Sequence, residues 1–419
     1  MRVAVIGGGI GGLAAAHELL RGGGDPLVLD EGARPGGKVG TREERGYLSE
    51  DGPNFLARPM DAVLDACGLR ADVVSPEGSQ VRWVHLDGRV FRAPSLPLLA
   101  RAGVGRALLE PLLAKPLRGD PSLADFLVER FGRRAGGLAA AVMSAGVYAG
   151  DPAALSARDA FPNLAALAEK GSLIVNAFRR PKAPRTGIWS LRRGLGSLAE
   201  ALARSLSGRV RSGVRVTRLA PAGGGWSVEG ERFDAVVLAI PAAAAAELTR
   251  GFAPAFAAGA RQLRNAPVTV VHLGLGAAAV PRGFGMIDAS GTLAASGTLL
   301  PSSMLPGRAP EGRALVTAIC GGARHPDRAA LPDRELVERV LSNLRDLWGV
   351  REHPDYVRVV RWTTGIAQYE VGHRERVRAL RESLRGLPPI ELAGASYDGV
   401  AVPDVARSGA AAAARLSSR

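Results

Sequence analysis

The glycines near the N-terminus are the first residues whose spacing suggests chemistry. Gly7, Gly9 and Gly12 match a GxGxxG pattern in the segment VIGGGIGG. The pattern follows an apolar run that reads as a buried strand and precedes residues with helical spacing. Glycines at such a turn allow a tight bend and a close approach of the backbone to a pyrophosphate, which the helix amides and dipole would bind. The residues expected to form this loop are Gly7, Gly8, Gly9, Ile10, Gly11 and Gly12.

An acidic pair ends the second expected strand, PLVLD. Asp30 stands 18 residues after Gly12, and Glu31 follows it. A carboxylate at this position accepts hydrogen bonds from the ribose hydroxyls of a bound dinucleotide. Strand, glycine loop, helix and acid together predict the βαβ start of a doubly wound fold.

Two further turns indicate which dinucleotide binds. The first lies in DEGARPGGKVGT, directly beyond the ribose-binding acid, and the second in EDGPNFL at residues 50–56. NAD has no evident need of these turns, whereas FAD lies across the sheet with its isoalloxazine ring far from its adenine. The pair of turns therefore favours FAD. The contacts expected from them are Arg34, Gly37, Lys38, Gly52, Pro53, Asn54 and Phe55.

The remaining chain divides into regions by its hydrophobic pattern. Residues 95–204 contain stretches of helical spacing with Arg on the polar side, which predict an inserted helical region whose helices cover a core. Strand-like segments return after Gly208, and DRELVERVLSNLRDLWG is expected to form an amphipathic helix. The segment from residue 388 reads as a strand, a turn and a helix that begins near Val402.

Composition bounds the class of protein. The chain has 419 residues, of which 47% are hydrophobic and 22% charged, as in a globular protein of two or three domains. Its net charge of +14 comes almost entirely from scattered Arg, which fits compositional bias as well as a binding patch. No zinc finger, basic zipper or RNA-binding strand is recognisable, so nucleic acid is not expected as a partner.

The location of the protein is predicted from three features of the sequence. The two cysteines are far apart, which favours a reducing compartment. The first residues lack the pattern of an export signal, and no apolar run is long enough for a transmembrane helix. We expect a cytoplasmic protein. Peripheral contact of a basic helix with the cytoplasmic face of the membrane stays open, as does the oligomeric state.

Several segments resemble a known family. VIGGGIGGLAAAHEL and LDEGARPGGK resemble the amine-oxidase-like FAD superfamily, in which the acid four residues before the Arg contacts ribose; here that acid is Asp30. Within it, the chain resembles the protoporphyrinogen oxidase family over almost its whole length. The most specific segments are GVYAGDPAALSARDAFP from residue 146, RWTTGIAQYEVGH from 361 and GASYDGVAVPDVARSG from 394.

This resemblance implies a fold and further FAD contacts. The implied class is α/β, with a Rossmann-like FAD-binding domain built from both chain ends, a mixed α+β substrate domain and the inserted helical region. We expect residues 1–60, 205–245 and 385–419 in the first, 61–94 and 246–384 in the second, and 95–204 in the third. Val216 is placed beside adenosine, and the other implied contacts lie toward the flavin. They are Trp362, Gly394, Val400, Ala401 and Val402.

The resemblance also implies substrate contacts. Arg82 matches an arginine that faces a propionate of the porphyrinogen in some relatives. Phe284, Gly285 and Ile287 would lie along the macrocycle. Relatives usually continue with Leu-Val-Pro where this chain has Met286, Ile287 and Asp288, so the identity of the substrate is less well determined than the cofactor.

The implied activity is the oxidation of protoporphyrinogen IX to protoporphyrin IX in haem biosynthesis, with molecular oxygen as acceptor. FAD carries the redox chemistry, with its N5 as hydride acceptor, so we assign no catalytic side chain. The six histidines show no metal-ligand spacing, and no metal is expected. Three alternatives stay open: oxidation of coproporphyrinogen III to coproporphyrin III, another flavin-dependent oxidation such as that of an amine oxidase or carotenoid desaturase, and an inactive flavoprotein-like module.

Overall fold

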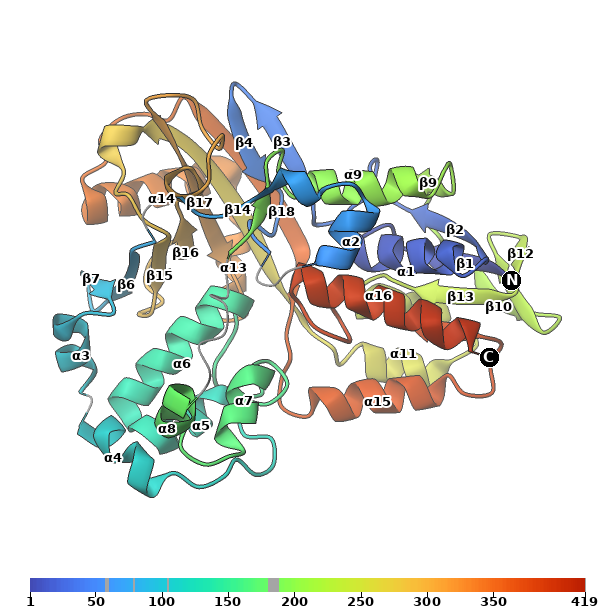
Figure 1. Ribbon diagram of the computed structural model, residues 1–419, viewed down its shortest axis with the longest axis horizontal. Coiled ribbons are helices and arrows are strands. Elements are labelled where there is room, and N and C mark those ends of the chain that lie inside the picture. The colour runs from blue at the N-terminus through green and yellow to red at the C-terminus, as the bar shows by residue number, and fades with distance from the viewer. Residues whose placement is uncertain (57–59, 78–79, 104, 180–187, 419) are drawn as a thin grey trace.

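The computed structural model describes residues 1–56, 60–77, 80–103, 105–179 and 188–418. Figure 1 shows two large sheets next to each other, with both chain termini at the far end of one and a group of helices below the other. The sheet near the termini is parallel and five-stranded, in the order β19-β13-β1-β2-β9. Its strands are β1 (Arg2–Ile6), β2 (Asp25–Asp30), β9 (Val210–Ser212), β13 (Ala235–Leu238) and β19 (Ile390–Leu392).

One face of this sheet packs against one helix from each end of the chain and one from its middle. They are α1 (Ile10–Arg21), α9 (Gly196–Ser205) and α16 (Val402–Ser417). Helices α1 and α16 approach closely because glycines meet between them: a Cβ on Gly409 would lie 2.0 Å from the carbonyl oxygen of Gly11. The expected helix start near Val402 is confirmed.

The other face is covered by a small antiparallel sheet and three helices. The sheet contains β10 (Leu219–Ala222), β11 (Gly225–Val228) and β12 (Glu231–Phe233). The helices are α10 (Ala242–Thr249), α11 (Pro254–Ala260) and α15 (His373–Ser383). The buried indole of Trp226 lies at the centre of this layer and donates a 2.9 Å hydrogen bond to the carbonyl of Pro389.

The second large sheet is mixed and seven-stranded, in the order β18-β14-β17-β16-β15-β6-β7. Its strands are β6 (Arg82–Leu86), β7 (Arg89–Ala93), β14 (Asn265–Gly276), β15 (Gly285–Asp288), β16 (Ala295–Leu299), β17 (Arg313–Gly321) and β18 (Tyr356–Ala367). Helix α14 (Asp333–Trp348), which the sequence predicts, buries Leu336, Val340 and Leu344 against this sheet.

The remaining short elements lie outside the two large sheets. They are β3 (Thr41–Glu44) with β4 (Tyr47–Glu50), β5 (Val73–Val74) with β8 (Ser190–Leu191), α2 (Asp61–Ala66), α12 (Pro301–Met304), α13 (Pro326–Ala330) and the 3-10 turns at Arg70–Asp72 and Ala277–Ala279.

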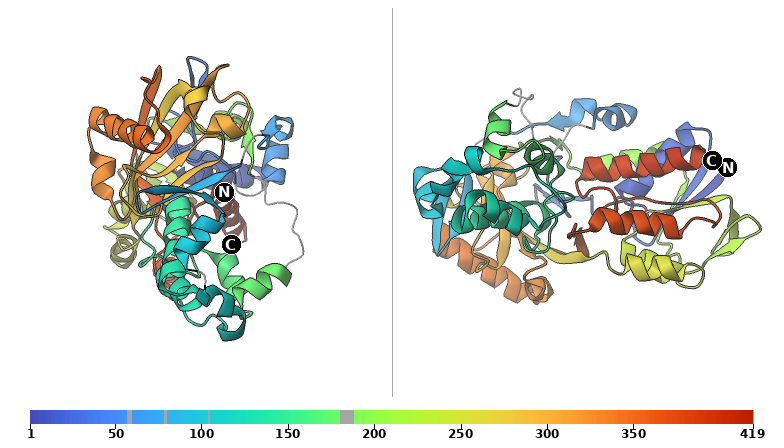
Figure 2. Two further views of the ribbon diagram at one scale, coloured as in Figure 1. Left: turned by 90° about the vertical axis from the view of Figure 1, so that its left-hand side faces the viewer. Right: turned by 90° about the horizontal axis from the view of Figure 1, so that it is seen from below.

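The inserted helices lie at the end of the molecule away from the termini, as Figure 2 also shows. They are α3 (Leu96–Ala102), α4 (Gly105–Leu113), α5 (Leu123–Phe131), α6 (Arg133–Tyr148), α7 (Pro162–Ala168) and α8 (Leu173–Arg179). Two carboxylates join this region to α15: Asp120 accepts the amide of Gly372 at 2.7 Å, and Asp159 accepts that of Arg374 at 2.8 Å.

The inserted helices were expected to turn their apolar side toward a core. Helix α4 instead turns its apolar side toward solvent. Its four large leucines are 50–82% exposed. They are Leu108, Leu109, Leu112 and Leu113. The side that faces inward carries Glu110, whose carboxylate is buried and accepts the amide of Leu173 at 2.7 Å. The expectation is therefore wrong for α4. The first amides of α8 need acceptors, and the carboxylate of Glu110 on the inward side of α4 supplies them.

The α/β class with a Rossmann-like domain from both chain ends, a mixed sheet and a helical insertion is confirmed. Within the described ranges, no helix is both long enough and apolar enough to cross a bilayer.

Candidate functional site

The glycine loop joins β1 to α1, and two of its glycines are required by the protein's own packing. Gly7 has a φ of +106°, and a Cβ there would lie 2.5 Å from the carbonyl oxygen of Ala239. A Cβ on Gly12 would lie 1.9 Å from the carbonyl oxygen of Gly7. Gly9 differs, because a Cβ there would meet no atom within 4 Å.

The open space beside Gly9 is suited to an anion. No side chain caps α1, so the amides of its first turn have no side-chain acceptor. Gly394, in the turn that follows β19, has a φ of +109° and also borders open space. Its Cα lies 3.2 Å from where a Cβ of Gly11 would stand, so the two turns touch. Uncapped amides and bare backbone from both chain ends make a cradle that fits the pyrophosphate of a dinucleotide.

Asp30 lies at the end of β2 and holds this loop. Its carboxylate accepts the amides of Gly8 and Gly32, the second at 2.8 Å. Glu31 is exposed and pairs with Arg215 at 3.6 Å. The amide of Val214 donates to the carbonyl of Asp30 at 2.8 Å, which brings the segment containing Val216 beside the end of β2. The residues expected on the adenosine side therefore come from adjoining segments.

Of the two turns expected to favour FAD, the first packs on the glycine loop and the second packs on the first. The amide of Gly36 donates to the carbonyl of Gly8 at 2.7 Å, and a Cβ on Gly37 would lie 3.3 Å from the Cα of Gly9. A Cβ on Gly52 would lie 2.7 Å from the carbonyl oxygen of Lys38, so the second turn lies against the first. Burial lowers the pKa of the Lys38 ammonium.

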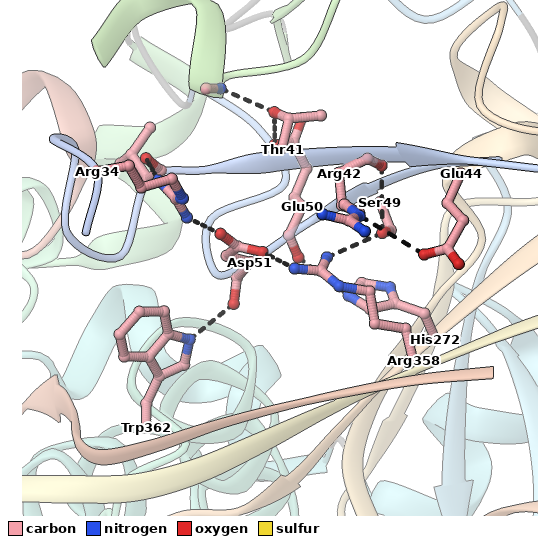
Figure 3. A network of polar contacts seen from close by, with 12 residues as sticks. Arg34, Thr41, Arg42, Glu44, Ser49, Glu50, Asp51, His272, Arg358 and Trp362 are labelled. Atoms are coloured by element: carbon pink, nitrogen blue, oxygen red, sulfur yellow. Dashed lines mark hydrogen bonds and ion pairs between the residues drawn. The ribbon is translucent and has the colours of Figure 1, made fainter. Parts of the chain in front are cut away.

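Asp51 connects these turns to the seven-stranded sheet, as Figure 3 shows. Its carboxylate is buried and forms ion pairs with Arg34 on one side and Arg358 of β18 on the other. Its carbonyl accepts a 2.7 Å hydrogen bond from the indole nitrogen of Trp362. The side chain of Arg34, expected to contact the cofactor, thus supports the turn through Asp51.

Neighbouring Glu50 is an unusual buried acid. Its two carboxylate oxygens accept the Thr41 hydroxyl at 2.6 Å and the Leu195 amide at 2.9 Å. Burial nevertheless raises the pKa of Glu50 to about 7. The carbonyl of Glu50 lies 3.0 Å from Nε2 of His272, whose pKa burial lowers to about 3. His272 is therefore a neutral packing residue at pH 7.

The C-terminal turn lies between β19 and α16. Val400 and Ala401 are half-buried, and Val402 begins α16. Ala401 stands at the helix start, and its carbonyl accepts the amides of Asp404 at 2.8 Å and Val405 at 2.9 Å, while Pro403 has no amide hydrogen. The amide of Val402 is the first-turn donor at a position suited to a ring edge on which negative charge grows during reduction.

The expected substrate residues come together in part. The guanidinium of Arg82 lies 4.7 Å from the ring centre of Phe284, and this ring is 5.6 Å from that of Phe55. Phe55 belongs to the same turn as Asp51. Ile287 instead packs toward α6, where its Cδ1 lies 3.0 Å from the Cβ position of Gly146. Gly285 is needed by the sheet itself, since a Cβ there would lie 2.1 Å from the carbonyl oxygen of Thr298.

Sequence reasoning missed the partners of these turns. Asp51 and Glu50 stand inside the quoted segment EDGPNFL, and their buried carboxylates were not singled out. Arg358 lies only four residues before Trp362, but nothing in the sequence separates it from the many other arginines.

The chain matches the family model described as flavin containing amine oxidoreductase over residues 10–417, and it belongs to that family. Within it, the chain is an FAD-dependent oxidase of the protoporphyrinogen oxidase type. It is 29% identical to coproporphyrinogen III oxidase of Bacillus subtilis over 98% of this chain and 96% of that one. It is 30% identical to the chloroplastic protoporphyrinogen oxidase of rice, over 95% of this chain and 84% of that one.

A solved structure supports the fold. A crystal structure from Exiguobacterium sp. 255-15, provisionally assigned as a protoporphyrinogen oxidase, superimposes with a TM-score of 0.87. The match covers 99% of this chain and 98% of that one, at 24% sequence identity. At this identity, the similarity establishes the fold alone.

FAD is the cofactor of this oxidase. When bound, it supplies the two-electron acceptor for the oxidation. The chain's own backbone amides are placed to hold the pyrophosphate, and Asp51 orients the Trp362 indole. The half-buried rings of Phe55 and Phe284 form an apolar surface, and the exposed guanidinium of Arg82 lies at its edge.

Proposed function

We propose that the protein oxidises protoporphyrinogen IX to protoporphyrin IX with molecular oxygen as the acceptor. The cluster of Phe55, Phe284 and Arg82 carries this proposal. Phe55 belongs to the turn expected to contact FAD, so the aromatic surface begins at the cofactor. Two apolar rings and one guanidinium match a flexible macrocycle that is mostly apolar at its edge and carries few carboxylates.

Coproporphyrinogen III is the second candidate. The Bacillus subtilis relative named for this substrate matches over 96% of its own length, against 84% for the rice enzyme. A macrocycle with a propionate on every pyrrole would need more cations than Arg82 supplies, and the chain's charge of +14 gives it a general attraction for polyanions.

One assay separates these candidates. Purified protein is loaded with FAD, its oxidised flavin spectrum is recorded, and each porphyrinogen is offered separately in air. We expect porphyrin fluorescence to rise faster with protoporphyrinogen and oxygen to be consumed in parallel. Faster turnover of coproporphyrinogen reverses the choice of substrate. Inactivity toward both, with flavin bound, refutes the porphyrinogen proposal, and turnover of an amine or polyene supports the remaining alternative.

Peripheral contact with the cytoplasmic face of a membrane is part of the same proposal. It is supported by the outward leucines of α4 together with exposed Leu96 of α3 and Phe178 of α8, which are 81% and 88% exposed. Exposed Lys115 and Arg118 follow α4 directly, and Arg133 and Arg134 begin α6. Apolar side chains beside cations are the pattern of a helix that lies in an anionic interface.

Vesicle binding tests this contact. Wild-type protein should sediment with vesicles that contain phosphatidylglycerol, and less with vesicles of phosphatidylcholine alone. The double variant Leu108→Gln with Leu112→Gln should lose most of this binding. Val357→Gln, at an exposed valine of β18, is the matched control. Equal sedimentation of all three proteins contradicts the contact.

The side-chain and domain assignments are also proposals. The FAD and substrate contacts named from the sequence, and the boundaries at residues 60, 94, 204, 245 and 384, stay predictions. Helix α9 lies within the predicted 95–204 region except for its last residue, Ser205, but it packs with α1 in the core beside the five-stranded sheet.

A further inference from the structure

The QYEVGH segment at residues 368–373 has no place among the proposed FAD and substrate contacts. Its tyrosine, Tyr369, follows β18 where that strand leaves the seven-stranded sheet. The side chain is only 4% exposed. A buried phenol needs hydrogen-bond partners, and those of Tyr369 belong to the C-terminal turn.

The Tyr369 hydroxyl forms hydrogen bonds with the backbone at both ends of the segment 395–399 in this turn. It donates a 2.9 Å hydrogen bond to the carbonyl of Ala395 and accepts one from the amide of Gly399. These two residues flank the bend between Gly394 and Val400. The phenol therefore fixes the backbone that leads into the residues expected against the flavin.

The Tyr369 ring is itself held in place by other segments. It stacks on the imidazole of His373, with ring centres 3.8 Å apart and planes at 15°. Its carbonyl accepts the amide of Ser156 at 2.8 Å, and its ring packs 6.0 Å from that of Tyr148 in α6. Helix α15 and the inserted region thus hold the phenol in place.

Other contacts also hold this turn. The carbonyl of Gly394 accepts the amides of Tyr397 at 3.1 Å and Asp398 at 3.3 Å, and the amide of Gly394 donates to the hydroxyl of Ser408 at 3.0 Å. Asp398 receives two 2.7 Å hydrogen bonds from Arg381 and one from the hydroxyl of Ser408. These contacts fix the start of the turn and the side chain of Asp398, whereas the carbonyl of Ala395 and the amide of Gly399 bond to Tyr369.

We propose that Tyr369 is a positioning residue for the flavin: its hydroxyl sets the backbone of residues 395–402 in the conformation that receives the ring. This inference rests on the proposed placement of FAD against Val400, Ala401 and Val402. It assigns to the QYEVGH segment a role that is exerted through the turn, without contact between Tyr369 and the reacting atoms.

Tyr369→Phe tests the proposal, with Tyr148→Phe as a matched control. The phenylalanine keeps the stack on His373 and removes only the hydroxyl. Tyr148 is equally buried in the same aromatic group, but its hydroxyl bonds the carbonyl of Ala160, away from the turn. Two measurements are made: amide hydrogen exchange of residues 394–402 in cofactor-free protein, and titration of cofactor-free protein with FAD, followed by flavin fluorescence and visible circular dichroism.

We expect Tyr369→Phe to speed exchange in the turn, weaken FAD binding about tenfold and change the flavin dichroism. Tyr148→Phe should leave all three as in wild type. Unchanged exchange and FAD affinity in Tyr369→Phe, or equal changes in both variants, would overturn the inference.

The wild-type protein supplies an independent test if Tyr369→Phe does not fold. The Gly399 amide should be protected from exchange in cofactor-free protein, and rapid exchange there contradicts the proposal. If wild type binds no FAD, the placement of FAD fails, while the exchange data still decide whether Tyr369 fixes the turn.

Discussion

The indole nitrogen of Trp362 donates a 2.7 Å hydrogen bond to the main-chain carbonyl of Asp51. This bond joins β18 of the seven-stranded sheet to the turn that precedes Phe55, so it connects the proposed substrate sheet to the proposed cofactor site. The carboxylate of the same Asp51 pairs with Arg34 and Arg358. One residue thus holds both parts of the site in register.

Trp362→Phe should weaken FAD binding while the protein still folds. The variant keeps an aromatic ring but leaves the Asp51 carbonyl without its donor, and one hydrogen bond corresponds to roughly a fivefold change in the dissociation constant. Titration of cofactor-free protein with FAD measures this. Trp348→Phe, at a tryptophan of α14 that packs on Trp83, is the control and should bind FAD normally. Equal affinities in both variants would show that the Trp362 bond does not support the cofactor site.

Asp51→Asn should destabilise the protein by about 2 kcal/mol, because the buried carboxylate is lost to the mostly buried Arg358 and to the half-exposed Arg34, whose ion pair is screened by solvent. Urea unfolding of cofactor-free protein measures the loss. Asp87→Asn removes a carboxylate from an exposed pair with Arg101, and it should cost less than about 1 kcal/mol. Similar losses in the two variants would contradict a structural role for the buried pairs.

Gly9→Ala and Gly12→Ala should fail in different ways. A Cβ on Gly12 overlaps the carbonyl oxygen of Gly7, so this variant should not accumulate in folded form. Gly9 has an ordinary φ of −69° and open space around it, so Gly9→Ala should fold with near wild-type stability. Its methyl group would occupy the proposed pyrophosphate position, and FAD affinity should fall by more than about tenfold. Normal FAD binding by Gly9→Ala would move the pyrophosphate elsewhere.

Arg82→Ala should raise the apparent KM for the porphyrinogen with little change in kcat. A lost charged hydrogen bond of about 1.5 to 3 kcal/mol corresponds to roughly a tenfold to hundredfold rise. Steady-state fluorescence assays measure both constants. Arg89→Ala changes an exposed arginine at the opposite end of the same hairpin and is the matched control. An unchanged KM in Arg82→Ala would remove this residue from the substrate site.

Glu50→Gln should alter how stability depends on pH. The pKa of Glu50 is raised by burial to about 7, above its unfolded value of 4.5. Its contribution to stability is therefore complete below pH 4.5 and is lost as the pH rises through 7. The glutamine of the variant cannot titrate, so only wild type loses this contribution as the pH rises. The free energy of unfolding of the variant minus that of wild type should therefore increase by about 3 kcal/mol between pH 4.5 and pH 7.

Urea unfolding of cofactor-free protein at a series of pH values measures this difference. The depressed pKa of His272 has the opposite effect, since its contribution is present above pH 6.5 and is lost as the pH falls toward about 3. It is common to both proteins and cancels in the comparison. A difference that does not vary with pH would mean that Glu50 titrates normally.

The sequence by itself determined the local secondary structure, which depends on residues close together in the chain. The strand, glycine loop and helix around Gly7, Gly9 and Gly12 follow from backbone sterics within a few residues, and so does the helix start at Val402. Residue spacing also predicted the helix at 333–348. The elements of the proposed FAD site, and FAD as the cofactor, were therefore predictable from short motifs.

Tertiary structure decided what depends on distant segments. Asp51 and Arg358 are 307 positions apart, and only the packing of β18 on the turn selects this arginine from the many in the chain. Helical spacing marked α4 but could not show which side faces inward, because the buried carboxylate of Glu110 finds its partners in α8. The contact of Tyr369 with Gly399 likewise exists only in the folded chain. The periodicity of apolar residues encodes local conformation. Which charged groups pair, and which groups form hydrogen bonds, depends on how segments distant in the sequence pack together.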